Sequence, residues 1–235
     1  MARGLTAKWR IGRSWSERQL LEYLQQLPDR RINFTDTPEP TAQGSDWTVD
    51  GVQDTIGSEA DGPPAADGIF ARARQALINY DFSDPRIVVG HFDPRTPLHG
   101  RNMLLEIKVF GLHFLGGVRV QEVMGETGSH ETRFGYRYDT LEGHFERGFE
   151  WFVLTKDHAT GEVRFSIEAH WQVGDFPTWW SRIGFALVGE RFRKIWRLRA
   201  VERVRRLATQ PEEKPLASPE TLAHRGDSRP TRTAR

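Results

Sequence analysis

The sequence VRFSIEAHWQV, residues 163–173, alternates apolar and polar side chains without interruption. In an extended strand, residues two apart lie on the same face. The apolar face would carry Val163, Phe165, Ile167, Ala169, Trp171 and Val173. Such alternation indicates a β-sheet with one dry face and one wet face, and the dry face needs a cover.

The same period of two recurs from Arg86 to Val173, and it predicts about six strands. We place them at residues 86–92, 102–110, 112–124, 130–139, 147–156 and 162–173. The segment 157–161, Asp-His-Ala-Thr-Gly, joins the last two strands as a hairpin. Short connections of this kind make neighbouring strands antiparallel.

Three other segments have a helical period. Residues 15–27 follow Ser14, which is expected to cap the helix with Glu17 in a capping box. Residues 69–79 follow Asp67 as a cap, and residues 178–207 form a long final helix. The expected apolar stripe of the final helix is Trp180, Ile183, Leu187, Val188, Phe192 and Ile195, after which arginine dominates.

Residues 35–66 are acidic, rich in Pro and Gly, and contain no Lys or Arg. This composition predicts an extended or partly disordered loop. We therefore divide the chain into residues 1–66 (a helix and an acidic loop), a folded domain at 67–208 and a disordered tail at 209–235. The chain order of helices, antiparallel strands and one long final helix is typical of an α+β fold. We expect a curved sheet that wraps around the final helix.

Composition excludes several classes of function. The 235 residues include no Cys, so disulfides, thiolate catalysis and Cys-based zinc sites are excluded. A net charge of +1 argues against nucleic acid as a partner. The polar first 26 residues resemble no signal peptide, and no apolar run is long enough to span a membrane, so a cytoplasmic location is expected. We find no cofactor motif and expect neither a cofactor nor a bound metal.

Residues 135–152, GYRYDTLEGHFERGFEWF, resemble the signature G-(F/Y)-x-Y-x-T-L-x-G-H-x-E-x-G-x-E-x-F of the DUF1990 family, also called UPF0548. The resemblance extends over about residues 67–205 and includes Phe82-Ser83-Asp84-Pro85. It implies a helix-grip fold of the START-like and Bet v 1-like group, whose members often hold an apolar ligand between sheet and helix. It implies no particular activity or ligand.

The segment 138–150 gathers titratable side chains around Gly143 and Gly148, which indicate special backbone angles. We interpret it as the polar rim of a ligand cavity, where loops on a rigid sheet often carry recognition. A structural turn and a metal or acid–base site remain alternatives. The candidate ligand-binding residues are Tyr136, Tyr138, Thr140, His144, Glu146, Glu150 and Trp151.

The final helix is strongly basic, with nine Lys or Arg and two Glu between residues 178 and 207. Its candidate patch for an anionic membrane or another acidic partner is Arg193, Lys194, Arg197, Arg199, Arg203 and Arg206. The alternatives are a solvated face or internal pairing with the acidic segment 35–66. Gly184 and Gly189 inside this helix indicate a close neighbour, either a strand or a ligand.

These observations lead to three hypotheses about the function of the protein. The first is a non-catalytic protein that binds a hydrophobic or amphipathic small molecule, such as a lipid, between the sheet and the final helix. The second is a peripheral membrane or interaction protein that uses the basic helix. The third is an enzyme, which would need a polar group with a perturbed pKa deep in the pocket.

Overall fold

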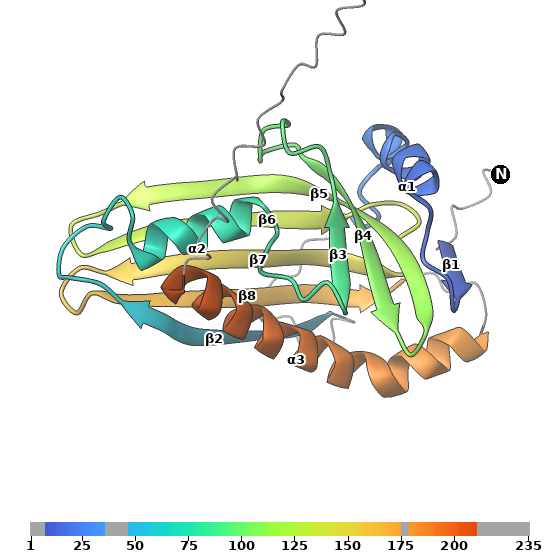
Figure 1. Ribbon diagram of the computed structural model, residues 1–235. Coiled ribbons are helices and arrows are strands. Elements are labelled where there is room, and N and C mark those ends of the chain that lie inside the picture. Colours follow the sequence, from blue (N-terminus) through green and yellow to red (C-terminus); the bar gives the residue numbers. More distant parts are fainter. Residues whose placement is uncertain (1–7, 36–46, 175–178, 211–235) are drawn as a thin grey trace, which may run out of the picture.

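The computed structural model describes residues 8–35, 47–174 and 179–210, except for the side chains of 179–188 and 190. Its centre is one antiparallel sheet in the order β2-β8-β7-β6-β5-β4-β3, with β1 also paired to β5 (Figure 1). The strands are β1 (Lys8–Ile11), β2 (Thr48–Ser58), β3 (Val88–His91), β4 (Asn102–Val109), β5 (Leu112–Thr127), β6 (Glu131–Thr140), β7 (Glu146–Asp157) and β8 (Glu162–Val173).

All six strands expected from the alternating pattern are present, with ends that differ by at most three residues. In β8 the predicted apolar face is buried from Val163 to Ala169, and Val163, Phe165 and Ile167 are each at most 1% exposed, whereas Val173 at the end of the strand is 40% exposed. Asp157 begins the predicted hairpin, where its carboxylate accepts hydrogen bonds from two backbone N–H groups of the turn. The period of two therefore fixed both the strands and their inward face.

The prediction of a loop over residues 35–66 is wrong for residues 48–58, which form the edge strand β2 paired to β8. Composition misled because the acidic residues of this strand are neutralised from a distant segment. Asp50 Oδ1 lies 2.7 Å from Arg197 Nη2, and Asp54 Oδ2 lies 2.7 Å from Arg205 Nη2. Ile56, 1% exposed, anchors the strand in the core. Residues 36–46 of the predicted loop and 211–235 of the predicted tail lie outside the described residues.

Three α-helices of the described residues accompany the sheet: α1 (Glu17–Leu24), α2 (Ile69–Ile78) and α3 (Trp179–Thr209). A short 3-10 helix, η1 (Leu27–Asp29), follows α1. Both predicted caps are wrong by one or two residues. Ser16, rather than Ser14, caps α1 and forms the capping box with Gln19. At α2 the N-cap is Gly68, and Glu59 replaces Asp67 because its carboxylate accepts the Phe70 N–H at 2.7 Å.

The helix α3 lies along the concave face of the sheet, which gives the helix-grip architecture (Figure 1). Its described core positions include Phe192, Trp196, Ala200, Val204 and Ala208, which lie four residues apart, and Val201 beside them. The apolar stripe therefore continues through the arginine-rich half, contrary to the prediction that it ends at Ile195, which is 39% exposed. Small alanines at this spacing let the helix approach the sheet between long basic side chains.

The turn Phe82–Pro85 fastens α3 to the rest of the core. The Phe82 ring packs 6.4 Å from the Trp196 ring and 4.9 Å from Phe152 of β7, measured between centroids. Trp196 Nε1 donates a hydrogen bond to Ser83 Oγ at 3.0 Å, and Asp84 forms an ion pair with Arg199 at 3.0 Å. This short turn thus contacts the helix in three ways: by aromatic packing, by a hydrogen bond and by an ion pair.

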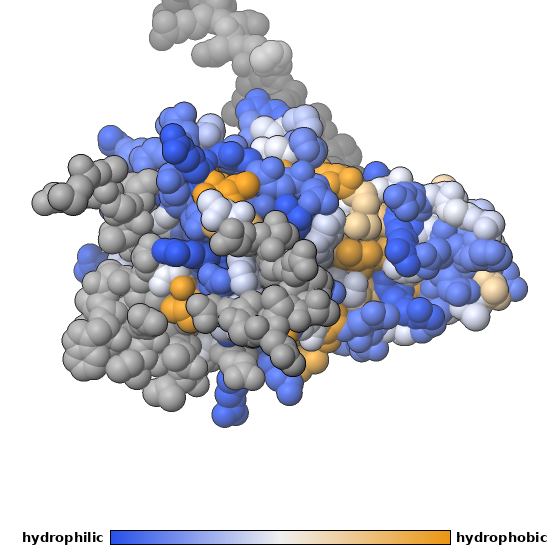
Figure 2. Space-filling view, turned by 180° about the vertical axis from the view of Figure 1, so that it is seen from behind, coloured by the Kyte–Doolittle hydropathy of each residue, from blue (hydrophilic) through white to orange (hydrophobic). Residues whose placement is uncertain are grey.

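Seen from the opposite side, the described surface is mostly hydrophilic, and apolar groups gather in a few places (Figure 2). Most large apolar side chains of the described residues are instead turned toward α2 and α3. No helix within the described parts of the chain combines the length and the apolarity needed to cross a membrane.

Candidate functional site: a cavity between the sheet and α3

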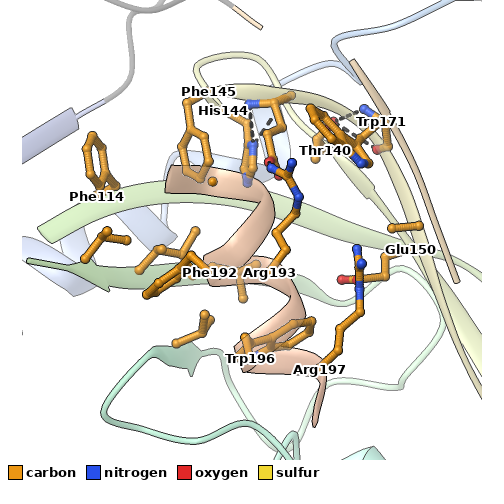
Figure 3. A pocket seen from close by; sticks show the side chains of 18 of the residues that line it. Phe114, Thr140, His144, Phe145, Glu150, Trp171, Phe192, Arg193, Trp196 and Arg197 are labelled. Atoms are coloured by element: carbon orange, nitrogen blue, oxygen red, sulfur yellow. Dashed lines mark hydrogen bonds and ion pairs between the residues drawn. The ribbon is translucent and has the colours of Figure 1, made fainter. Parts of the chain in front are cut away.

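A cavity with a volume of about 290 Å³ lies between the concave face of the sheet and the described start of α3 (Figure 3). Strands β4 to β8 supply most of its walls, with Trp9 of β1 and Val88 of β3, and α3 closes it with Gly189, Phe192 and Trp196. Apolar lining side chains include Tyr80, Leu105, Ile107, Phe114, Ala169 and Trp171. Phe110, in the tight turn between β4 and β5, also lines it and is 85% exposed, so the cavity extends to the surface there.

Five of the seven predicted ligand-binding residues line this cavity, namely Tyr138, Thr140, His144, Glu146 and Glu150. They belong to the end of β6, the turn after it and the start of β7. The structure does not bring the other two to the cavity. Tyr136 is 1% exposed in the packed core and donates its hydroxyl to Leu77 O, and Trp151 is paired in register with Arg137 and Glu168 in the sheet.

The two exceptions follow from strand geometry. Trp151 is one residue away from Glu150, so its side chain points to the other face of β7. Tyr136 is on the same face as Tyr138 but one pair further along β6, where the core is filled by Phe152 at a ring distance of 5.2 Å. The motif therefore located the right segment, whereas the sheet's curvature and the position of α3 selected which side chains meet the cavity.

Glu150 is the buried acid of the cavity wall. Its Oε2 accepts the Tyr138 hydroxyl at 2.6 Å, and its Oε1 lies 3.6 Å from Arg197 Nε. Burial raises the pKa of Glu150 to about 7, although the Arg197 cation and the Tyr138 hydrogen bond lower it. A carboxyl group with this pKa changes charge near neutral pH, and it does so inside an apolar cavity.

Glu146 and Arg193 form a second ion pair beside it, with 2.8 Å between Oε1 and Nη1. Burial raises the pKa of Glu146, and Arg193 is the main opposing influence. The Arg193 guanidinium also stacks 3.6 Å above the Trp171 ring. These contacts tie α3 to the end of β7 and β8, so the polar part of the wall is held in place from both sides.

His144 is buried, and its ring packs on Phe145 with centroids 4.6 Å apart. Its Nδ1 accepts the backbone N–H of Glu146 at 3.0 Å, and burial lowers its pKa to about 4. The ring is therefore neutral over the physiological range. A Cβ placed at Gly116 of β5 would lie 2.2 Å from His144 Cδ2, so a glycine there makes room for the imidazole.

Gly143 and Gly148 have positive φ angles of 85° and 150°, as the sequence indicated. At Gly148 a Cβ would also lie 2.0 Å from the backbone oxygen of His170. Thr140 Oγ1 accepts the Gly148 N–H at 2.8 Å, which joins the end of β6 to this irregular start of β7. These contacts form the turn that presents Glu146 and Glu150 on the same wall of the cavity.

The basic side chains of α3 are largely engaged within the chain. Arg193, Arg197 and Arg199 pair with Glu146, with Asp50 and Glu150, and with Asp84, respectively. Arg203 donates to the backbone oxygen of Asp81, whereas Lys194 and Arg206 are exposed. Internal pairing with the segment 35–66 is confirmed by the Arg197–Asp50 pair, and the described contacts do not favour the membrane patch.

Sequence reasoning placed the ligand against the final helix but missed the contribution of its arginines to the cavity wall. Arg193 and Arg197 were assigned to a surface patch, yet both line the cavity. A signal was present, because each follows directly after an aromatic residue, Phe192 or Trp196, that lies on the buried stripe. Gly189 also lines the cavity, which agrees with the close neighbour expected there, and the side chain position of residue 184 lies outside the described residues.

The sheet, the enclosing helix and the cavity between them define a helix-grip protein with an internal pocket. Its family follows from the sequence: the model of DUF1990, a domain of unknown function, matches residues 33–203. The chain belongs to the DUF1990 family. The match begins before β2, so it includes the edge strand that composition had assigned to a loop.

Among solved structures, Ara h 8.0201 is 9% identical with a TM-score of 0.38, over 69% of this chain and 97% of that one. Norcoclaurine synthase from Thalictrum flavum, in complex with dopamine and hydroxybenzaldehyde, is 9% identical with a TM-score of 0.42, over 77% and 100%. A hypothetical protein, jhp0584 from Helicobacter pylori, is 15% identical with a TM-score of 0.40, over 73% and 96%. These similarities carry no argument about activity. A comparison with curated proteins finds no match.

Proposed function

We propose that the protein binds a small hydrophobic or amphipathic molecule in the cavity between the sheet and α3. The observation that carries this proposal is the composition of the cavity, whose walls are mostly apolar and whose polar and charged lining groups include Tyr138, Glu150 and Arg197. Pockets for small molecules have this character, and their volumes begin at about 300 Å³. Apolar groups placed against such walls gain about 25 cal/mol for each Å² removed from water.

The cavity is also supported by the packing around it. The half of the concave face toward the end of α3 is filled by Phe82, Phe152, Phe165 and Trp196, which fix the helix in position. The other half is held open by a frame of ion pairs rather than closed by apolar contacts. Aromatic side chains thus fill one half of the concave face, whereas ion pairs border the other half. This arrangement supports ligand binding over a purely structural role for the segment 138–150.

The test uses N-phenyl-1-naphthylamine, an uncharged dye that becomes fluorescent in apolar surroundings. Wild-type protein is expected to bind it saturably. The variant Ala169→Phe places a ring in the cavity and is expected to weaken binding about tenfold or more, which corresponds to about 1.4 kcal/mol. The matched control Val123→Phe adds the same ring at a residue of β5 that is 40% exposed and does not line the cavity.

Circular dichroism of all three proteins shows whether each variant is folded. Weak, non-saturable fluorescence with wild-type protein would remove the basis of the proposal. Equal dye binding by the Ala169→Phe variant and the control would place the dye elsewhere on the molecule and would have the same consequence.

A further inference from the structure

The carboxylate of Glu150 and the guanidinium of Arg197 face each other across the polar side of the cavity (Figure 3). The two closest atoms of this pair, Oε1 and Nε, are 3.6 Å apart. A direct hydrogen bond between nitrogen and oxygen is about 2.7–3.2 Å long. The two groups are therefore close enough to form an ion pair but too far apart for a direct hydrogen bond.

One further atom of each group has another partner. Glu150 Oε2 accepts the Tyr138 hydroxyl at 2.6 Å, and Arg197 Nη2 lies 2.7 Å from Asp50 Oδ1. These contacts prevent the two side chains from rotating toward each other. Arg197 is 4% exposed, and its Nε has no hydrogen-bond partner among the described residues. A buried donor in this state is costly, so a group that satisfies it is favoured.

We infer that the bound molecule carries a hydroxyl group that joins Glu150 and Arg197, and that the ligand is therefore an apolar alcohol or phenol. This inference rests on the proposed binding function. A hydroxyl oxygen about 2.8 Å from both atoms accepts the Arg197 Nε–H and donates its own proton to Glu150 Oε1. A hydroxyl suits the pair because it is a donor and an acceptor in a single atom.

Charged head groups fit this wall less well. A ligand carboxylate would face the acids Glu146 and Glu150, and a ligand ammonium would face the cations Arg193 and Arg197. Each charge in the wall already has an opposite partner, so a neutral polar group leaves the balance unchanged. The rest of the ligand would lie against Ile107, Phe114, Phe192 and Trp196.

Two molecules that differ in one group test the inference: 2-(2-naphthyl)ethanol and 2-propylnaphthalene, in which a methyl replaces the hydroxyl. Their affinities are measured by displacement of N-phenyl-1-naphthylamine at pH 8.5, where Glu150 is ionised. Hydrogen bonds to charged groups have a net value that corresponds to about tenfold or more in affinity, so wild-type protein is expected to prefer the alcohol by about tenfold. In Glu150→Gln the acceptor is neutral and the bond about half as strong, so the preference falls to about threefold.

The matched control is Glu168→Gln, which makes the same change on the outer face of β8, where the Glu168 side chain is 61% exposed. This control is expected to keep the wild-type preference. Equal affinity of wild-type protein for the two molecules would overturn the inference, because a water molecule would then satisfy the pair equally well, while the binding function would stand. An unchanged preference in Glu150→Gln would also overturn it, since the hydroxyl would bind elsewhere. If the dye binds saturably but neither molecule displaces it, the inference alone fails, whereas the absence of saturable dye binding defeats the proposed function itself.

Discussion

Replacing Glu150 by glutamine should make the protein more stable at alkaline pH, and the size of the effect follows from burial. The folded-state pKa of Glu150 is about 7, whereas the ordinary value is 4.5. The difference of about 2.5 pH units, at about 1.36 kcal/mol each, gives up to about 3 kcal/mol. Glutamine has nearly the same shape, can accept the Tyr138 hydroxyl, and cannot ionise.

The direction follows from proton linkage. Between pH 4.5 and 7 the folded protein keeps the proton of Glu150 and the unfolded chain has lost it. The wild-type free energy of unfolding therefore falls across this window and reaches its full loss above pH 7. His144 acts in the opposite direction, because burial lowers its pKa to about 4 and its contribution to stability is lost as the pH falls through the range below 6.5. Both proteins contain His144, so its effect cancels when they are compared.

The assay is urea unfolding of wild-type protein and Glu150→Gln at several pH values from 4.5 to 8.5, followed by circular dichroism. The stability of the variant relative to wild type is expected to rise steadily with pH and to level off above pH 7. Glu126→Gln, which changes an exposed side chain of β5, should show no such trend. A constant difference between wild type and Glu150→Gln at every pH would refute the reasoning, because it would mean that Glu150 keeps an ordinary pKa in the fold.

Three further predictions concern the framework of the cavity. Phe82→Ala removes a fully buried ring that contacts the turn, the sheet and α3, and it should lower the free energy of unfolding by about 3–5 kcal/mol in chemical denaturation. Gly116→Ala should displace the buried imidazole beside it and weaken dye binding, whereas Gly125→Ala, which has no atom within 4 Å of the new methyl, should leave binding unchanged in the same titration. Lys156 is 1% exposed and lies 2.9 Å from Glu59, so Glu59→Gln should lower stability by about 3–5 kcal/mol, and a shift of less than about 1 kcal/mol would contradict a buried pair.

Local patterns in the sequence were sufficient for six of the eight described strands and for the segment that forms the polar wall. The alternation in residues 163–173 predicted both the strand and its buried face, because side-chain direction in a strand depends only on position. The motif at residues 135–152 likewise located the turn between β6 and β7. Its glycines at 143 and 148 have the positive φ angles that the pattern indicated.

Long-range pairing could not be predicted in the same way. The sequence predicted an acidic loop at residues 48–58, because composition gives the charge of a segment but not the charge of the segments that pack against it in space. The arginines of α3, about 150 residues later, neutralise Asp50 and Asp54 and allow β2 to join the sheet. For the same reason Arg193 and Arg197 looked like a surface patch, although the fold turns them toward buried acids.

The sequence by itself determined the three helices, the six strands between residues 86 and 173 and the apolar face of the sheet, since these properties depend on neighbours along the chain. Only the tertiary structure decided which side chains surround the cavity, that Glu150 meets Arg197 there, and that Trp151 does not. Those outcomes depend on the curvature of the sheet and on the place where α3 crosses it, and both are set by contacts between segments far apart in the sequence.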